Sequence, residues 1–144
     1  MNKIKEEKLV LRDKQISEFI LKYEDEYKKI NINLKEKILD SKAHEIHDDI
    51  CKNNIYTSTT AVLVYCFASL NANKMTNSLT EIMFEEAIII ARFLDESFNQ
   101  FSKPIGPLHG IPFSIKDTFD IKNFGKAFNS VKNLLIDIQI QLLV

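Results

Sequence analysis

The stretch GPLHGIPFSIKD, residues 106–117, contains two of the chain's three glycines and two of its three prolines. This density of glycine and proline predicts a tightly turned backbone. After the turn, large apolar residues occupy every second position. A strand with this pattern would carry three of them on one face: Ile111, Phe113 and Ile115. Pro112 cannot donate to a strand ladder, so we expect it at the start or the edge of the strand.

Lys116 ends this predicted strand and shares its second face with Ser114. From the residues alone, two interpretations of the lysine stay open. In the first, it is a surface lysine paired with Asp117 or Asp120. In the second, the strand is buried, and loss of solvent lowers the pKa of the lysine because burial disfavours its charged form. A neutral lysine can accept a proton, so the second interpretation makes it a candidate general base.

Helical periodicity dominates the residues before the turn. It is clearest over 84–98, where one face collects Phe84, Ala87, Ile88, Ala91, Leu94 and Phe98. The segment SKPIGP, 102–107, is expected to end this helix. Ser78 and Glu81 have the spacing of a capping box, although residues 79–83 fit either a first helical turn or a short extended piece.

Three further helices are predicted nearer the N-terminus, over 3–29, 34–53 and 61–71. The last of these is apolar nearly all round, as in a buried helix, and Ser58 or Thr59 is expected to cap it. Cys66 lies within that apolar run, so we expect it in the core. At the other end of the chain, the tail VKNLLIDIQIQLLV fits either a helix or a strand.

Charge is concentrated near the N-terminus, where residues 1–52 hold 12 of the 19 Lys/Arg and 12 of the 20 Asp/Glu. The net charge is −1, which does not favour binding to nucleic acid or to an anionic membrane. The longest apolar stretch, 61–70, is about half the roughly 20 residues that span a bilayer. The N-terminus has no sustained apolar run of the kind found in secretory signals. We therefore expect a soluble, cytoplasmic protein without a transmembrane segment.

Metal and disulfide chemistry have little support in the sequence. The two cysteines, Cys51 and Cys66, form no CxxC motif and are expected to be reduced. His44, His47 and Asp48 have a helical spacing that could share a metal ion, and a solvated helix face is the alternative. Because no third firm ligand accompanies the histidines, we expect no metal site and no cofactor.

The segment GPLHGIPFSIKDTFDIK resembles the lysine-bearing segment of the amidase signature family. The preceding TNSLTEIMFEEAIIIARFLDE is similar to the corresponding region of its acetamidase-like, general amidase branch, which is related to the fatty acid amide hydrolases. AHEIHDDICKNNIYTSTTAVLVYCFAS resembles the preceding helices of that branch more loosely. The resemblance runs from about residue 40 to residue 122 and covers only the N-terminal part of the family's domain.

This resemblance implies a hydrolase that cleaves carboxamide C–N bonds with a Ser–cis-Ser–Lys triad and acts on small-molecule amides. Lys116 matches the catalytic lysine, which would take a proton through a bridging serine so that a second serine attacks the amide carbonyl. The glycines and prolines of 106–112 match a structural turn. His109 lies in that turn, where the family has no catalytic histidine.

The departures from the family concern the serines. In the family, the bridging serine and the nucleophile lie downstream in a stretch rich in glycine and serine. The nine serines of this chain lie outside any such context, and Gly125 is the only glycine after the motif. Similarity also fades at residue 123. We therefore expect no amide hydrolysis by this polypeptide alone.

The fold class implied is α/β: N-terminal helices leading into the first strand of the mixed, helix-flanked sheet of the amidase signature fold, here incomplete. We divide the chain into a charged helical arm (1–33), the N-terminal portion of an amidase domain (34–122) and a divergent tail (123–144).

An N-terminal fragment of an amidase is the first functional hypothesis. The alternatives are a truncated paralogue that docks on an intact amidase and an autonomous helical interaction protein. The sequence does not indicate an oligomeric state.

Overall fold

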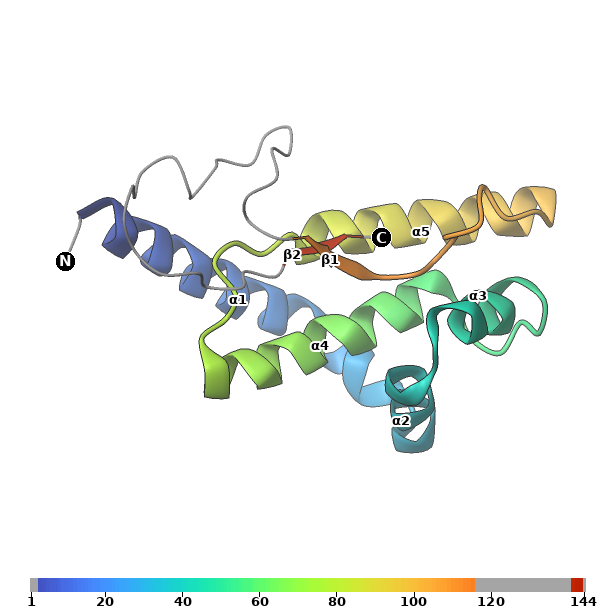
Figure 1. Cartoon of the computed structure of the whole chain (residues 1–144), viewed down its shortest axis with the longest axis horizontal. Helices are drawn as coiled ribbons and strands as arrows, with labels where there is room; N and C mark the ends of the chain where they lie inside the picture. The colour runs from blue at the N-terminus through green and yellow to red at the C-terminus, as the bar shows by residue number, and fades with distance from the viewer. Residues whose placement is uncertain (1–2, 116–140, 144) are drawn as a thin grey trace.

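The computed structural model in Figure 1 describes residues 3–115 and 141–143. Helices account for most of them, and two short strands complete the described part. The elements in chain order are α1 (Lys3–Lys29), α2 (Ile32–Asp40), α3 (Ala43–Cys51), α4 (Ser58–Thr76), α5 (Phe84–Phe101), β1 (Phe113–Ile115) and β2 (Gln141–Leu143).

Helix α4 is the centre of the described fold. It packs most extensively against α5 and also contacts α1 and α2 (Figure 1). Nine residues of α4 are buried, including Ala61, Val62, Leu63 and Val64 in succession. A helix that is apolar on all sides requires neighbours on all sides, which explains its central place. The prediction of a buried helix over 61–71 is confirmed, and the helix extends further in both directions.

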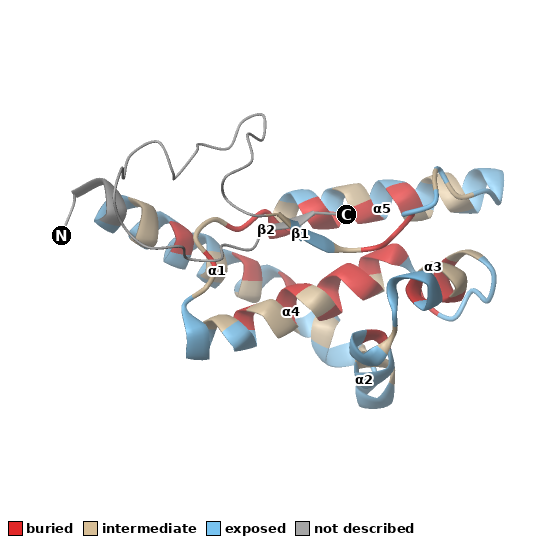
Figure 2. Ribbon diagram, viewed as in Figure 1, coloured by how far each residue is buried: buried red, intermediate tan, exposed pale blue. Residues whose placement is uncertain are grey.

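The core consists of two clusters of buried side chains that both use α4 (Figure 2). The first joins α1, α4 and α5, and aromatic rings are prominent in it: Phe19 lies 5.1 Å from Phe84 and 5.6 Å from Phe67 between ring centroids. The second joins α2, α3 and α4 and includes Ile111, which follows the glycine-rich turn. This turn therefore packs against the earlier helices.

The prediction of one continuous helix over 34–53 is wrong, because two helices, α2 and α3, occupy that segment. The break falls at Ser41 and Lys42, whose ψ angles of 143° and 159° are extended. The Ser41 hydroxyl donates to the Lys37 carbonyl (2.7 Å), and the Lys42 N–H donates to the Glu45 carboxylate (2.6 Å). These two hydrogen bonds satisfy backbone groups at the helix ends, so the break needs neither glycine nor proline.

The expected caps around α4 and α5 are also corrected. Thr57, and not Ser58 or Thr59, is the N-cap of α4, with its Oγ1 accepting from the Thr60 N–H at 3.2 Å. Of the two conformations left open for residues 79–83, the first helical turn is wrong, since α5 starts at Phe84 and the segment before it is not helical; Ser78 therefore begins no helix.

Contacts with α1, and not a helical turn, fix the conformation of segment 77–83. Glu81 forms an ion pair with Lys8 at 2.9 Å, so its carboxylate is not used as a cap. Arg12, 8% exposed, donates from Nη1 to the Leu79 carbonyl and to the Asn77 side chain. These contacts dock α1 on the loop that leads into α5.

Strand β1 pairs with β2 antiparallel, with Phe113 opposite Leu143 and Ile115 opposite Gln141. Part of the apolar tail is thus a strand, while the rest of the tail lies outside the described residues. The shared apolar face predicted for β1 is wrong: Ile111 precedes the strand and is buried, whereas Phe113 is 44% exposed. Pro112 lies directly before the strand, as expected.

The described part is mostly helical, which is consistent with an incomplete α/β amidase fragment. Its one sheet among the described residues has two strands, so the mixed sheet expected from the family stays a prediction. Among the described helices, none combines the length and the apolar character needed to cross a membrane.

Candidate functional site

The candidate site begins where α5 ends. Ser102 adopts a left-handed conformation with φ of 50°, and its N–H donates to the Phe98 carbonyl at 2.8 Å. A left-handed residue at this point turns the chain sharply away from the helix axis. The chain then runs back along α5 towards β1 (Figure 1).

Three local hydrogen bonds shape the turn between α5 and β1. The His109 N–H donates to the Gly106 carbonyl at 3.2 Å, and the Ile111 N–H donates to the Leu108 carbonyl at 3.1 Å. The Ile105 N–H donates to Nδ1 of His109, also at 3.2 Å. The backbone of this segment, which we call the 105–111 turn, is therefore fixed by its own groups before it reaches the strand.

Gly110 seats the turn against the earlier helices. Its φ is +76°, and a Cβ placed on it would lie 2.7 Å from Ser58 Oγ and 2.7 Å from Ile50 Cδ1. Only glycine satisfies both the left-handed backbone and this close approach. The start of α4 and the end of α3 thus form the surface on which the turn rests.

Asp95 of α5 holds the start of α4 in place. Its Oδ1 accepts from the Ser58 N–H at 2.7 Å, and its Oδ2 accepts from the Thr59 N–H at 3.0 Å and from the Thr59 hydroxyl at 2.6 Å. A carboxylate at a helix N-terminus satisfies free N–H groups and complements the helix dipole. Asp95 therefore fixes Ser58, the residue on which Gly110 rests.

His109 is buried within the turn, with 3% of its surface exposed. Its ring lies 5.6 Å from that of Phe98, and its Nε2 is buried without a hydrogen-bond partner among the described residues. Burial disfavours the imidazolium and lowers the pKa of His109, an effect that nearby Asp95 opposes and His47 reinforces. The neutral ring is the form that fits this site, since its Nδ1 must accept a hydrogen bond.

The turn delivers the chain into β1, and Lys116 follows the last residue of that strand. Ser114 is exposed in the described strand. Lys116, Asp117 and Asp120 lie outside the described residues, so both interpretations of the lysine remain open. Among the described residues, the structure brings together the packed side of the turn and the residues beneath it. These are Ile50, Ser58, Asp95, His109 and Gly110.

Of the other residues that the sequence singled out, Cys66 belongs to the core, and His47 lies near enough to His109 to affect its pKa. Cys66 is fully buried, as expected, and burial raises the pKa of its thiol. His47 Nδ1 lies 3.4 Å from Asp48 Oδ1. Within residues 3–115 and 141–143, no three His, Cys, Asp or Glu side chains gather as a metal site.

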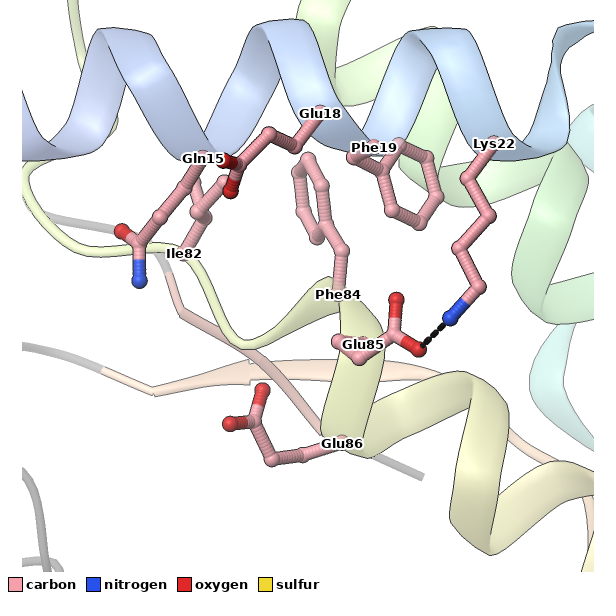
Figure 3. Close-up of a pocket in the computed structure, with 8 residues that line it drawn as sticks. All are labelled: Gln15, Glu18, Phe19, Lys22, Ile82, Phe84, Glu85 and Glu86. Carbon is pink, nitrogen blue, oxygen red and sulfur yellow. Dashed lines mark hydrogen bonds and ion pairs between the residues drawn. The ribbon is translucent and has the colours of Figure 1, made fainter.

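A hollow of about 340 Å³ lies between α1 and the start of α5 (Figure 3). Its apolar wall is formed by Phe19, Ile82 and Phe84, and its polar side includes the ion pair of Lys22 and Glu85. The Tyr23 hydroxyl also donates to Glu85 at 2.9 Å. Since Glu85 already has two partners that join α1 to α5, we interpret this hollow as a structural junction.

Comparison with known proteins decides the family. The profile of the Amidase family matches residues 60–131, which are half of the chain. The chain belongs to the amidase family. The match begins within α4 and includes Asp95, the 105–111 turn and the position of Lys116. No solved structure matches the chain.

Fungal amidases are among the similar proteins. An amidase of Gibberella moniliformis is 43% identical over 58 residues, which are 40% of this chain and 11% of that amidase. The acetamidase of Emericella nidulans is 32% identical over 88 residues, 61% of this chain and 16% of that enzyme. The acetamidase of Aspergillus oryzae is 35% identical over 86 residues, which are 60% of this chain and 16% of that enzyme. The chain spans less than a fifth of the length of these relatives.

Sequence reasoning missed Asp95. Its position gives a signal in retrospect, because it follows Leu94 and lies between Ala91 and Phe98 on the core side of α5. A carboxylate on an apolar helix face is costly to bury unless it has hydrogen-bond donors. The N-terminus of α4 supplies them.

Proposed function

We propose that this chain is the lysine-bearing N-terminal part of a hydrolase that cleaves the C–N bond of carboxamides. In this proposal residues 34–122 belong to the amidase domain, residues 1–33 form a helical segment whose α1 packs on α4 and α5, and residues 123–144 form a divergent tail. Membership of the amidase family supports amide substrates. The bridging and nucleophilic serines would come from a segment other than these 144 residues.

The observation that carries the proposal is the anchored 105–111 turn, which leads into β1, the strand that Lys116 follows in the sequence. Gly110 is in contact with Ser58, Ser58 is held by Asp95, and Ile111 is buried in the second core cluster. A general base must be placed within hydrogen-bond reach of its partner, and a rigid approach to the strand supports such placement. Lys116 would act as the base of the triad, taking the proton of the nucleophile by way of the bridging serine.

A chimera tests this proposal. In the acetamidase of Emericella nidulans, the stretch that aligns with residues 76–122 is replaced by those residues of this chain. We expect the chimera to release ammonia from acetamide. Lys116→Ala should lower its kcat/KM by about a hundredfold to ten-thousandfold, the usual contribution of a general base. Lys103→Ala, which changes an exposed lysine of the same segment, should alter kcat/KM by less than about twofold.

The result must be separated from a failure to fold. A smaller replacement, limited to residues 102–117, keeps the acetamidase's own sequence in the region that aligns with α5. It is used if the chimera with the larger replacement does not fold. A folded chimera that is inactive would contradict the proposal that this segment can serve in an amidase, and activity that survives Lys116→Ala would show that this lysine is not the base.

A further inference from the structure

His109 holds the 105–111 turn through an acceptor nitrogen. The Ile105 N–H donates to Nδ1 of the imidazole at 3.2 Å, and the His109 N–H donates to the Gly106 carbonyl at the same distance. One residue therefore closes the turn with both its side chain and its backbone. The hydrogen bond to Nδ1 differs from the backbone bonds of the turn, because its acceptor belongs to a group that titrates near neutral pH.

Protonation of the ring would remove this hydrogen bond. A neutral imidazole has one donor and one acceptor nitrogen, whereas the imidazolium has two donors. Because Nδ1 accepts from the Ile105 N–H, protonation would place two N–H groups opposite each other. An attractive contact would become a repulsive one, and the ring would have to move away from Ile105.

The surroundings of His109 also act on its charge. The residue is 3% exposed, and its ring lies beside Phe98 of α5. Asp95 of α5 favours the imidazolium, His47 of α3 disfavours it, and the first turn of α4, residues 58–60, has no titratable side chain. Burial has the largest effect, so the pKa of the ring lies below its ordinary value.

The imidazole is adjacent in sequence to the residues that seat the turn. Gly110 rests on Ser58 and Ile50, and Ile111 is buried in the second core cluster. Both lie between His109 and β1. A displacement of the ring therefore acts at the point where the chain is fixed before it enters the strand.

We propose that His109 is a positioning residue for amide hydrolysis: its neutral ring holds the 105–111 turn closed, and protonation of the ring opens the turn. The proposal rests on the proposed function, because the turn leads into the strand that Lys116 follows. His109 acts through the turn and not on the reacting atoms. A closed turn fixes the approach to Lys116, and an open turn releases it.

Nuclear magnetic resonance of the full 144-residue chain tests the turn without catalysis. At about pH 7.5, the ¹⁵N shifts of the His109 ring should identify Nδ1 as the unprotonated nitrogen. Between about pH 7.5 and about pH 5.5, the hydrogen-exchange protection factor of the Ile105 amide should fall several-fold. The limit is about tenfold, for a histidine of pKa 6.5 that is protonated only in the open turn.

The amide of Val64, a fully buried residue of α4, is the internal reference. It should be more strongly protected than the Ile105 amide at both pH values, because the turn opens while the core stays folded. Equal protection of the two amides would mean that the turn opens only when the whole chain unfolds, which would overturn the proposal.

Two substitutions separate the loss of the hydrogen bond from the gain of a proton. His109→Asn keeps an acceptor that does not titrate in this range, so the protection of the Ile105 amide should no longer depend on pH. His109→Ala removes the acceptor, so this amide should be weakly protected at both pH values. The unaltered chain decides the proposal by itself if either variant fails to fold.

The acetamidase chimera supplies the catalytic readout. Its kcat/KM should fall between about pH 7.5 and about pH 5.5 by a several-fold larger ratio with His109 than with His109→Asn, because only the imidazole opens the turn on acidification. His109→Ala should have a lower kcat/KM than His109→Asn at both pH values, since asparagine restores the acceptor.

Three further results would overturn the proposal. They are a proton on Nδ1 of His109 at about pH 7.5, protection of the Ile105 amide that does not change with pH in the unaltered chain, and equal pH ratios of kcat/KM for the chimera and its His109→Asn variant. Any of these, with lysine-dependent hydrolysis intact, would refute the role of His109 alone. A pH-dependent turn together with hydrolysis that survives Lys116→Ala would refute the proposed function instead.

Discussion

At the scale of single residues, Gly110 links the turn to the body of the protein. Its left-handed φ and its contact with Ser58 and Ile50 leave no space for a side chain. The density of glycine and proline predicted a turn here, and the turn is present. The sequence did not distinguish Gly110 from Gly106, because the difference arises from Ile50 and Ser58, which are distant in the sequence and pack against only one of the two glycines.

The first prediction compares these two glycines. Gly110→Ala should lower the free energy of unfolding by about 2–4 kcal/mol, because it combines a left-handed backbone penalty with steric overlap in a packed site. Gly106→Ala is the control, since no atom lies within 4 Å of the position of its Cβ and its φ is not positive. Urea denaturation of both variants measures the difference. Equal effects would mean that the turn does not rest on Ser58 and Ile50.

The second prediction concerns the pH dependence that His109 introduces. Unfolding restores its pKa to the ordinary value of 6.5, while burial in the folded chain holds the pKa lower. As the pH falls through about 6.5, the unfolded chain gains a proton that the folded chain resists, so the free energy of unfolding decreases. The decrease ends below the folded-state pKa.

Urea denaturation at about pH 7.5 and about pH 5.5 measures this effect across the titration range of histidine. His109→Asn, whose side-chain oxygen can accept from the Ile105 N–H, should reduce the pH dependence. His44→Asn, at an exposed position, should retain it. An unchanged pH dependence in His109→Asn would show that His109 does not resist protonation in the folded chain.

At the scale of secondary structure, apolar periodicity predicted α1, α4 and α5 well. It could not predict the break at Ser41 and Lys42, because that break depends on side-chain hydrogen bonds at the helix ends. The spacing of Ser78 and Glu81 suggested a cap, whereas contacts with α1 hold this segment in a non-helical form. Lys116 could be recognised only through its motif.

The third prediction tests whether α1 is part of the folded body. Phe19 of α1 is 4% exposed and packs on rings of α4 and α5. Phe19→Ala should therefore lower the free energy of unfolding by about 3–5 kcal/mol, the usual cost of removing a buried aromatic ring. Leu21→Ala, at the 88% exposed position on the same helix, should change it by less than about 0.5 kcal/mol. Comparable small losses for both would mean that α1 is a loosely attached arm.

At the scale of the whole molecule, the described residues form a helical body that positions one turn and one strand. The family could be recognised from residues 76–122, because the spacing of glycine, proline and lysine is specific. The extent of the sheet could not be derived, since strand pairing depends on partners that are distant in the sequence, as β1 and β2 are.

The fourth prediction follows from the serines. The purified 144-residue chain should release no ammonia from acetamide, because its serines lie outside the glycine-rich context in which the family places its nucleophile. An ammonia assay with the intact acetamidase as the positive control measures this. Turnover by the chain that disappears in Lys116→Ala would mean that one of its own serines is the nucleophile.

The most direct measurement is the kcat/KM for acetamide of the folded acetamidase chimera, before and after Lys116→Ala. We predict measurable hydrolysis that falls by about a hundredfold or more in the variant, with Lys103→Ala unaffected. Equal kcat/KM values with and without Lys116 would contradict the central claim that the anchored turn serves to place a catalytic lysine.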